Sequence, residues 1–368
     1  MNVREMRCQA DRLTIIWEDG DASEYHATWL RDNDPANRDL STGQRLIDAA
    51  DLPADLTIQG GRYSAENGLV RVSFSDCHAS LFPGDWLHRH SISDREAAPA
   101  ALWEASTPGV LHRFSYPEVS ESSAARLQWL EALAAFGIAF LADVPIEKDK
   151  MLEVAAMIGW VRETNYGRIF DVRAVPDSNN LAYTSRALGL HTDNPYRDPV
   201  PGLQLLHCLC AGSTGGASLF ADGFAVAEAL RKYDPHAFEM LTGTPVRFEF
   251  ADAATHLWAQ RPLIQKASDG RVEAVAYNSR SIAPLRLSFR HMDEFYPAYR
   301  QFAHLLRDER FVVSTPLAAG ELVAFDNRRV LHGRTAFSVT EPRWLQGCYL
   351  DHDGLRSHIA VLQRHGSD

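Results

Sequence analysis

Three side chains of this sequence could together bind a divalent metal ion. His191 and Asp193 stand two residues apart, and residues i and i+2 of an extended strand point to the same face. A second histidine, His332, follows far along the chain, shortly after the apolar run 321–325. Two imidazoles and one carboxylate form a facial set of ligands for iron(II) that leaves positions on the ion open. The pattern therefore indicates oxygenase chemistry, in which the open positions accept a 2-oxo acid and dioxygen.

Two residues outside this triad could bind the acid itself. Arg343 lies eleven residues after His332, just before an expected strand at 344–349. Its guanidinium could hold the distal carboxylate of 2-oxoglutarate through two parallel hydrogen bonds. Ser218 follows His191 by 27 residues and could donate its hydroxyl to the same carboxylate. The simpler alternative is that Arg343 is a surface cation and His332 an ordinary core histidine.

The composition restricts the partners and the compartment. The chain has 368 residues, of which 45% are hydrophobic and 23% charged, an ordinary globular balance. Its net charge of -11 argues against nucleic acid as a partner, because binding to nucleic acid needs a basic surface. No apolar run approaches the roughly 18 residues that cross a bilayer. Five scattered cysteines indicate neither a disulfide framework nor a paired metal site. We therefore expect a cytoplasmic protein without membrane or nucleic-acid partners.

The apolar runs and turns divide the chain into three parts. We expect a small N-terminal β-rich domain over residues 1–95, in which the runs 13–17 and 22–28 form a hairpin. Segments rich in alanine, proline and glycine predict a linker at 96–118. The remainder, 119–368, alternates short apolar runs with turns and a few helices, which favours a mainly β sandwich or jelly roll. The expected helices there are 124–136, 225–232 and 292–306, and the expected strands are 137–141, 203–209, 247–250, 321–325 and 344–349.

At this level of detail the chain resembles a known family. Residues 120–360 resemble the taurine dioxygenase-like (TauD/TfdA-like) superfamily, with the triad, a Gly-Gly-x-Ser element and Arg343 in order. Nearly the whole chain resembles the γ-butyrobetaine hydroxylase branch, which has a small N-terminal β domain. The sequence elements that carry this resemblance are Trp29–Asn33, Asn180–Thr184, Phe325–Asn327, Leu331–Arg334 and Gln346–Tyr349.

The resemblance implies a fold, a reaction and cofactors. The catalytic domain would be a double-stranded β-helix (jelly roll), with helices around it. The enzyme would use Fe(II) and O2, convert 2-oxoglutarate to succinate, and hydroxylate an unactivated C–H bond, with ascorbate as the reductant in vitro. Relatives are commonly dimers, so the resemblance also implies a homodimer.

Substrates of this branch carry a trimethylammonium group, which cation–π attraction holds in an aromatic cage. The resemblance places the cage at Tyr166, Phe170, Tyr183 and Tyr349, although these could equally be core aromatics. The anionic end of the substrate would meet polar residues near the site, for which the candidates are Asn180, Arg197, Asn278, Ser279 and Arg280.

The chain departs from the family pattern in two places. Relatives hold a structural zinc with three cysteines and a histidine, but the stretch 34–39 contains no cysteine, although His88 and His90 remain. We therefore expect no structural zinc there. A cage position that is tryptophan in the animal enzyme is Phe170 here, followed by Asp171. The Asp171 carboxylate could attract the substrate cation, or could pair with Arg168 or Arg173.

These departures bear on the choice of substrate. The γ-butyrobetaine hydroxylase branch includes relatives that act on 2-(trimethylamino)ethylphosphonate. The missing zinc site, Asp171 and Arg280 together favour a resemblance to that sub-branch, because arginine suits the larger charge of a phosphonate. Formation of carnitine from γ-butyrobetaine remains open, and Arg280 could instead form a structural ion pair. Two broader alternatives are a dioxygenase for another small acid, and a non-enzymatic binding module on the same scaffold.

Overall fold

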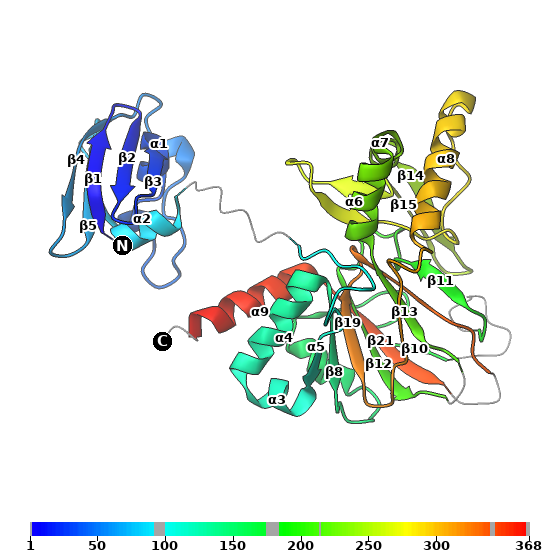
Figure 1. Cartoon of the computed structure of the whole chain (residues 1–368). Helices are drawn as coiled ribbons and strands as arrows, with labels where there is room; N and C mark the ends of the chain where they lie inside the picture. Colours follow the sequence, from blue (N-terminus) through cyan, green and yellow to red (C-terminus); the bar gives the residue numbers. More distant parts are fainter. Residues whose placement is uncertain (1, 92–99, 174–183, 213–214, 339–342, 366–368) are drawn as a thin grey trace. The chain divides into compact units, whose positions relative to one another are not determined.

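The computed structural model describes residues 2–91, 100–173, 184–212, 215–338 and 343–365. The chain folds as two units, residues 1–98 and 99–368 (Figure 1). Each unit has a hydrophobic core of its own, so the two are described separately.

The N-terminal unit consists of two three-stranded antiparallel sheets and two short helices. The first sheet contains β1 (Val3–Cys8), β2 (Arg12–Trp17) and β3 (Ala22–His26), and the second contains β4 (Ile58–Ser64), β5 (Leu69–Phe74) and β6 (Ala79–Pro83). Strands β2 and β3 form the expected hairpin, with Leu13 opposite Tyr25. The second run ends early, because α1 (Ala27–Asp32) begins where His26 Nδ1 accepts a hydrogen bond from Thr28 N–H. Helix α2 spans Gly84–Arg89.

Hydrogen bonds hold the cysteine-free stretch that follows α1. The Asp34 side chain is 1% exposed and accepts hydrogen bonds from the Ser80 hydroxyl at 2.7 Å and the Ala36 N–H at 2.9 Å. His78 is its third partner. A buried carboxylate is stable when its oxygens are satisfied in this way. In this chain, side-chain hydrogen bonds therefore connect the segment to β6.

Two sheets form the centre of the C-terminal unit. The larger has the order β10-β21-β12-β19-β8-β7, with β9 beside β21, and the smaller has the order β11-β20-β13-β18. The strands of the larger sheet are β7 (Arg113–Ser115), β8 (Ile138–Ala142), β9 (Val161–Arg162), β10 (Phe170–Val172), β12 (Leu203–Cys210), β19 (Leu322–Asp326) and β21 (Trp344–Leu350). Those of the smaller sheet are β11 (Leu188–His191), β13 (Ser218–Asp222), β18 (Val313–Thr315) and β20 (Val330–Arg334). This is the expected mainly β fold with a double-stranded β-helix core.

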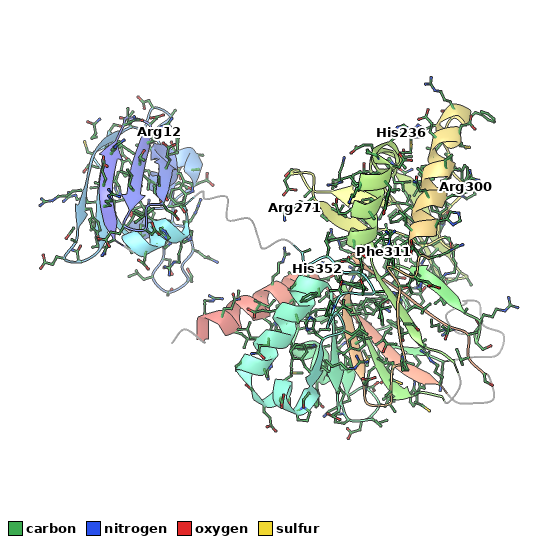
Figure 2. All side chains as sticks on the ribbon, viewed as in Figure 1. Arg12, His236, Arg271, Arg300, Phe311 and His352 are labelled. Atoms are coloured by element: carbon green, nitrogen blue, oxygen red, sulfur yellow. The ribbon has the colours of Figure 1, made fainter. Side chains whose placement is uncertain are left out.

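The larger sheet is buried on both faces, and the side chains alternate between them. In β19, Leu322 and Ala324 pack towards helices, whereas Val323 and Phe325 pack towards the smaller sheet with Phe220. Such strands are largely apolar, which is why they are visible in the sequence as nearly continuous runs. The helices over the outer face include α3 (Tyr116–Glu121), α4 (Ser123–Phe136), α5 (Met151–Ala156) and α9 (His352–His365). The last of these begins at His352 (labelled in Figure 2), whose Nε2 lies 3.0 Å from Asp326 Oδ1 at the end of β19.

A second helical group packs beside the smaller sheet. It contains α6 (Gly223–Tyr233), α7 (Pro235–Gly243) and α8 (Phe289–Leu305), together with the hairpins β14 (Val246–Ala251)–β15 (His256–Arg261) and β16 (Ile264–Lys266)–β17 (Val272–Val275). Their common core includes Phe311, which is 1% exposed (Figure 2). The described part of the chain contains no helix that is both long and apolar enough to span a membrane.

The described residues of the segment expected as a linker, 100–118, belong to the C-terminal unit. Trp103 is 1% exposed, and its backbone N–H donates to the Asp222 carboxylate at 3.1 Å. Arg329, which pairs with Asp222 at 2.8 Å, also donates to the Ala101 carbonyl. Strand β7 then pairs in parallel with β8. Residues 100–118 are therefore packed against the C-terminal unit.

Candidate metal centre and substrate cavity

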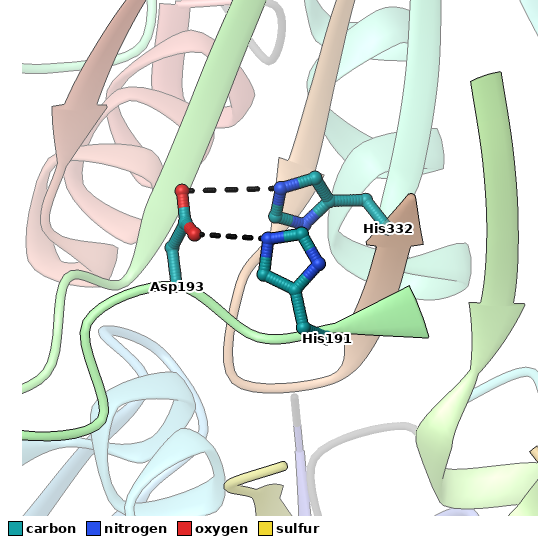
Figure 3. Close-up of side chains that lie close together, drawn as sticks. All are labelled: His191, Asp193 and His332. Atoms are coloured by element: carbon teal, nitrogen blue, oxygen red, sulfur yellow. Dashed lines mark ion pairs between the residues drawn. The ribbon is translucent and has the colours of Figure 1, made fainter. Parts of the chain in front are cut away.

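The two histidines of the predicted triad lie side by side on adjacent strands. Strands β11 and β20 pair so that His191 stands opposite His332, and the ring centroids are 4.3 Å apart. The Asp193 carboxylate faces both rings, with Oδ1 3.2 Å from His191 Nε2 and Oδ2 3.8 Å from His332 Nε2 (Figure 3). One donor atom from each residue lies within 4.8 Å of the other two. The triad residues therefore converge from distant parts of the chain.

Asp193 reaches this position in a different way from the one expected. Strand β11 ends at His191, so His191 and Asp193 do not share an extended strand. A buried amide holds the turn instead: Asp193 N–H donates to Asn327 Oδ1 at 2.7 Å, and Asn327 Nδ2 donates to the Asp193 carbonyl at 3.0 Å. Asn327 is fully buried and lies between β19 and β20, so it fixes Asp193 relative to His332.

The protonation of these groups suits metal binding. His191 Nδ1 lies 2.9 Å from the Gly189 carbonyl, which fixes the proton on Nδ1 and leaves the Nε2 lone pair towards Asp193. Burial, with a smaller effect of the neighbouring His191, lowers the pKa of His332 to about 3 and keeps it neutral. Burial acts to raise the pKa of Asp193, but its position beside His191 and His332 and the hydrogen bond from the Tyr349 hydroxyl bring it well below its ordinary value. Imidazole lone pairs and an ionised carboxylate are the donors that iron(II) binds.

A cavity of about 310 Å³ opens beside the triad, between the two sheets. Its walls include residues from β10, β12 and β21 of the larger sheet and from β11, β13 and β20 of the smaller one. Ten of the predicted site residues line it, namely Tyr166, Phe170, His191, Asp193, Ser218, Asn278, Arg280, His332, Arg343 and Tyr349. The structure thus brings most of the predicted set into one space.

One end of the cavity is cationic. Arg343 is 8% exposed and lies over the Phe337 ring at 5.4 Å, where it donates to the Gly216 carbonyl at 3.3 Å. Among the described residues, no carboxylate pairs with its guanidinium. Ser218 and Arg334 stand opposite each other on β13 and β20 and line the same space. A buried guanidinium that has no carboxylate partner in the described part of the chain fits a carboxylate ligand.

Aromatic side chains form another part of the cavity wall. Phe170 and Tyr349 lie with ring centroids 5.0 Å apart. Phe250 stacks on Tyr196 at 5.2 Å and meets Tyr166 at 6.1 Å, and all three line the cavity. These ring faces offer a surface on which a cation without hydrogen-bond donors could lie.

Three predicted residues lie outside the cavity lining. Asp171 points to the other face of the sheet, where Trp344 Nε1 donates to it at 2.8 Å and Gln346 Nε2 at 3.3 Å. It therefore neither faces the cage nor depends on Arg168 or Arg173. Arg197 donates to the Asn165 side chain, and Ser279 is exposed. Asn180 and Tyr183 lie outside the described residues.

Asn278 lines the cavity, but its side chain already makes hydrogen bonds within the protein. Its Nδ2 donates to the Thr192 carbonyl at 3.1 Å, and its Oδ1 accepts from Arg280 N–H at 3.2 Å. The Asn278 amide therefore connects the 278–280 turn to the backbone of Thr192, which lies between His191 and Asp193. Arg280, an exposed residue of this turn, lines the cavity.

Sequence reasoning missed several functional candidates. Arg334 could have been found, because it lies two residues after His332 on β20, and residues i and i+2 of a strand face the same side. No sequence pattern marked Tyr196 and Phe250, because they meet only where β14 packs against the turn that follows Asp193. Asn327 was part of the family pattern, but its contact with Asp193 is visible only in the fold.

A family model described as "Taurine catabolism dioxygenase TauD, TfdA family" matches residues 94–349. A second, described as "Gamma-butyrobetaine hydroxylase-like, N-terminal", matches residues 5–88. The chain belongs to the TauD, TfdA family and carries the N-terminal domain of its γ-butyrobetaine hydroxylase-like members. It is a 2-oxoglutarate-dependent dioxygenase that uses iron(II).

Similar proteins cover nearly the whole chain. It is 39% identical over 363 residues to a γ-butyrobetaine dioxygenase of Pseudomonas sp. (strain AK-1). The matched region covers 96% of this chain and 94% of that protein. It is 29% identical to a mitochondrial trimethyllysine dioxygenase of Gallus gallus, over 96% of this chain and 86% of that protein. Among solved structures, AAD-2 in complex with Mn(II) and N-oxalylglycine matches 68% of this chain and 97% of its own at a TM-score of 0.51 and 16% identity.

Proposed function

We propose that this enzyme hydroxylates a small substrate with a trimethylammonium group at one end and an anionic group at the other. The observation that supports this most is the aromatic wall formed by Phe170 and Tyr349 beside the triad. Similar proteins named for γ-butyrobetaine and trimethyllysine, both of which carry this cation, point the same way. γ-Butyrobetaine is the first candidate.

In this proposal each part of the cavity has one task. His191, Asp193 and His332 hold the iron, which together with 2-oxoglutarate supplies the activation of dioxygen for insertion into a C–H bond. Arg343 binds the distal carboxylate of 2-oxoglutarate with help from Ser218, and its burial strengthens this ion pair relative to water. The substrate lies between the aromatic wall and the triad.

The aromatic wall would select the substrate by its charge. Trimethylammonium offers no hydrogen-bond donor, so ring faces attract it better than polar groups do. Each cation–π contact is worth about 0.5–2 kcal/mol, depending on desolvation. Tyr166, Tyr196 and Phe250 extend the wall.

Arg280 is the proposed partner of the anionic end. Among the described residues it forms no ion pair, and it lines the cavity. This residue keeps 2-(trimethylamino)ethylphosphonate as a second candidate, because a guanidinium suits a phosphonate. The case for the phosphonate is weaker than the sequence suggested, since Asp171 faces away from the cavity.

The experiment is a substrate comparison with purified protein, Fe(II), 2-oxoglutarate and ascorbate. We expect succinate and hydroxylated product with γ-butyrobetaine, and much less with 5,5-dimethylhexanoate, which replaces the nitrogen by carbon and keeps the shape. Taurine serves as the control for a small acid without the cation. Equal turnover of γ-butyrobetaine and 5,5-dimethylhexanoate would contradict the proposed cation site. 2-(Trimethylamino)ethylphosphonate is assayed alongside, and a higher kcat/KM for it than for γ-butyrobetaine would select the second candidate.

A further inference from the structure

Tyr349 touches a candidate metal ligand as well as the aromatic wall. It lies on β21, and its side chain is part of the cavity lining although the residue is only 4% exposed. Its hydroxyl donates to Asp193 Oδ2 at 2.8 Å. Its ring lies 5.0 Å from that of Phe170. The two ends of one side chain therefore meet two different parts of the site.

The contact joins the two sheets at the triad. His191 and His332 belong to the smaller sheet, whereas Tyr349 belongs to the larger one. The Asp193 backbone is already held by Asn327, but that amide does not touch the carboxylate. Among the described residues, the hydroxyl that donates a hydrogen bond to the Asp193 carboxylate belongs to Tyr349. Without it, the side chain of Asp193 could rotate within the turn.

We propose that Tyr349 is a positioning residue of the metal site, whose hydroxyl fixes the Asp193 carboxylate while its ring forms part of the cation wall. Partners of this kind orient metal ligands, and their loss usually weakens metal binding by about 10- to 100-fold. The role of the ring rests on the proposed function. The role of the hydroxyl does not, because it concerns the metal alone.

The two roles can be separated by substitution. Tyr349→Phe removes the hydroxyl and keeps the ring, and Tyr349→Leu removes both. Tyr196→Phe is the matched control, because it removes another phenol from the same cavity, one whose hydroxyl contacts Asn194 and Tyr166 but none of the triad residues. The dissociation constant for Mn(II) is measured with 2-oxoglutarate present, from the electron paramagnetic resonance signal of the free ion. The melting temperature of each metal-free variant is measured in parallel.

We expect Tyr349→Phe to raise the dissociation constant for Mn(II) by about 10- to 100-fold, and Tyr196→Phe to leave it within about threefold. At saturating metal, Tyr349→Phe should keep the KM for γ-butyrobetaine, whereas Tyr349→Leu should raise it. A 4-aminophenylalanine at position 349, which can donate the same hydrogen bond, should restore metal affinity. This variant also gives a result if Tyr349→Phe does not fold.

Unchanged Mn(II) affinity in Tyr349→Phe, or an equal loss in Tyr196→Phe, would overturn the inference. So would a failure of the amino analogue to improve on Tyr349→Phe. The metal titration contains no trimethylammonium compound. Absence of turnover with γ-butyrobetaine would therefore refute the proposed substrate and leave the role of the hydroxyl standing.

Discussion

A single methyl group added at Gly347 should displace Phe170 and so test the aromatic wall. The two residues stand opposite each other on β21 and β10. A Cβ at position 347 would lie 2.4 Å from Phe170 Cε2 and 2.5 Å from Cζ, and 3.1 Å from Leu206 Cδ2. Ordinary carbon contacts are about 3.5–4.0 Å, so the ring must move by about an ångström or more. The backbone of Gly347 is not in the left-handed region, so alanine itself is not strained there.

The size of the effect follows from two contributions. Overpacking of this kind costs about 1–3 kcal/mol of stability. If the displaced ring loses its contact with the substrate cation, about 0.5–2 kcal/mol of binding is lost, which corresponds to a rise in KM of roughly two- to thirtyfold. We expect this rise for γ-butyrobetaine, whereas the KM for 2-oxoglutarate, bound at the Arg343 end, should stay unchanged.

A double-mutant cycle shows whether the effect acts through the ring. Leucine at position 170 lacks the two atoms that the new methyl group would meet, so Gly347→Ala should have little effect in a Phe170→Leu background. Steady-state KM values are compared for the wild type, both single variants and the double variant. A KM that does not change in Gly347→Ala, or that changes equally in both backgrounds, would refute this account of the wall.

Three further predictions concern charge and stability. Arg329→Met should lower the free energy of unfolding of the C-terminal unit by about 3–5 kcal/mol in urea titrations, because it leaves the fully buried Asp222 without its cation; a loss under 1 kcal/mol would contradict this. Arg343→Lys should raise the KM for 2-oxoglutarate more than that for the substrate, because lysine cannot form the two parallel bonds, and equal changes would argue against the assignment. Burial lowers the pKa of His207. Below about pH 6.5 the unfolded chain therefore binds a proton that the folded chain does not, and the free energy of unfolding decreases as the pH is lowered. His207→Asn should therefore flatten the fall in urea midpoint below that pH, and an unchanged slope would refute the reasoning.

The buried strands were accessible from sequence because both faces of the larger sheet are covered. Residues 322–325 are all apolar, and the strand expected at 321–325 corresponds to β19 within one residue at each end. The helix expected at 124–136 likewise forms as α4. The short helix α5 and the terminal helix α9 were not predicted.

The site was harder to foresee, because strand pairing and loop packing decide it. Alternation along β10 puts Phe170 in the cavity and Asp171 on the opposite face, so a residue next to a cage position in sequence is not next to it in space. The position of Asp193 depends on Asn327, which is 134 residues away in sequence. The hydroxyl of Tyr349 meets the triad only because the two sheets face each other across the cavity.

The central claim is that His191, Asp193 and His332 hold one metal ion in front of the Arg343 end of the cavity. A crystal structure of the protein with Mn(II) and 2-oxoglutarate, with anomalous scattering recorded at the manganese edge, tests it most directly. We predict a peak bound by both Nε2 atoms and the Asp193 carboxylate, with the distal carboxylate of 2-oxoglutarate at Arg343. A peak at the exposed group of Asp19, Asp21 and His88 instead, or His332 turned away from the metal, would contradict the account.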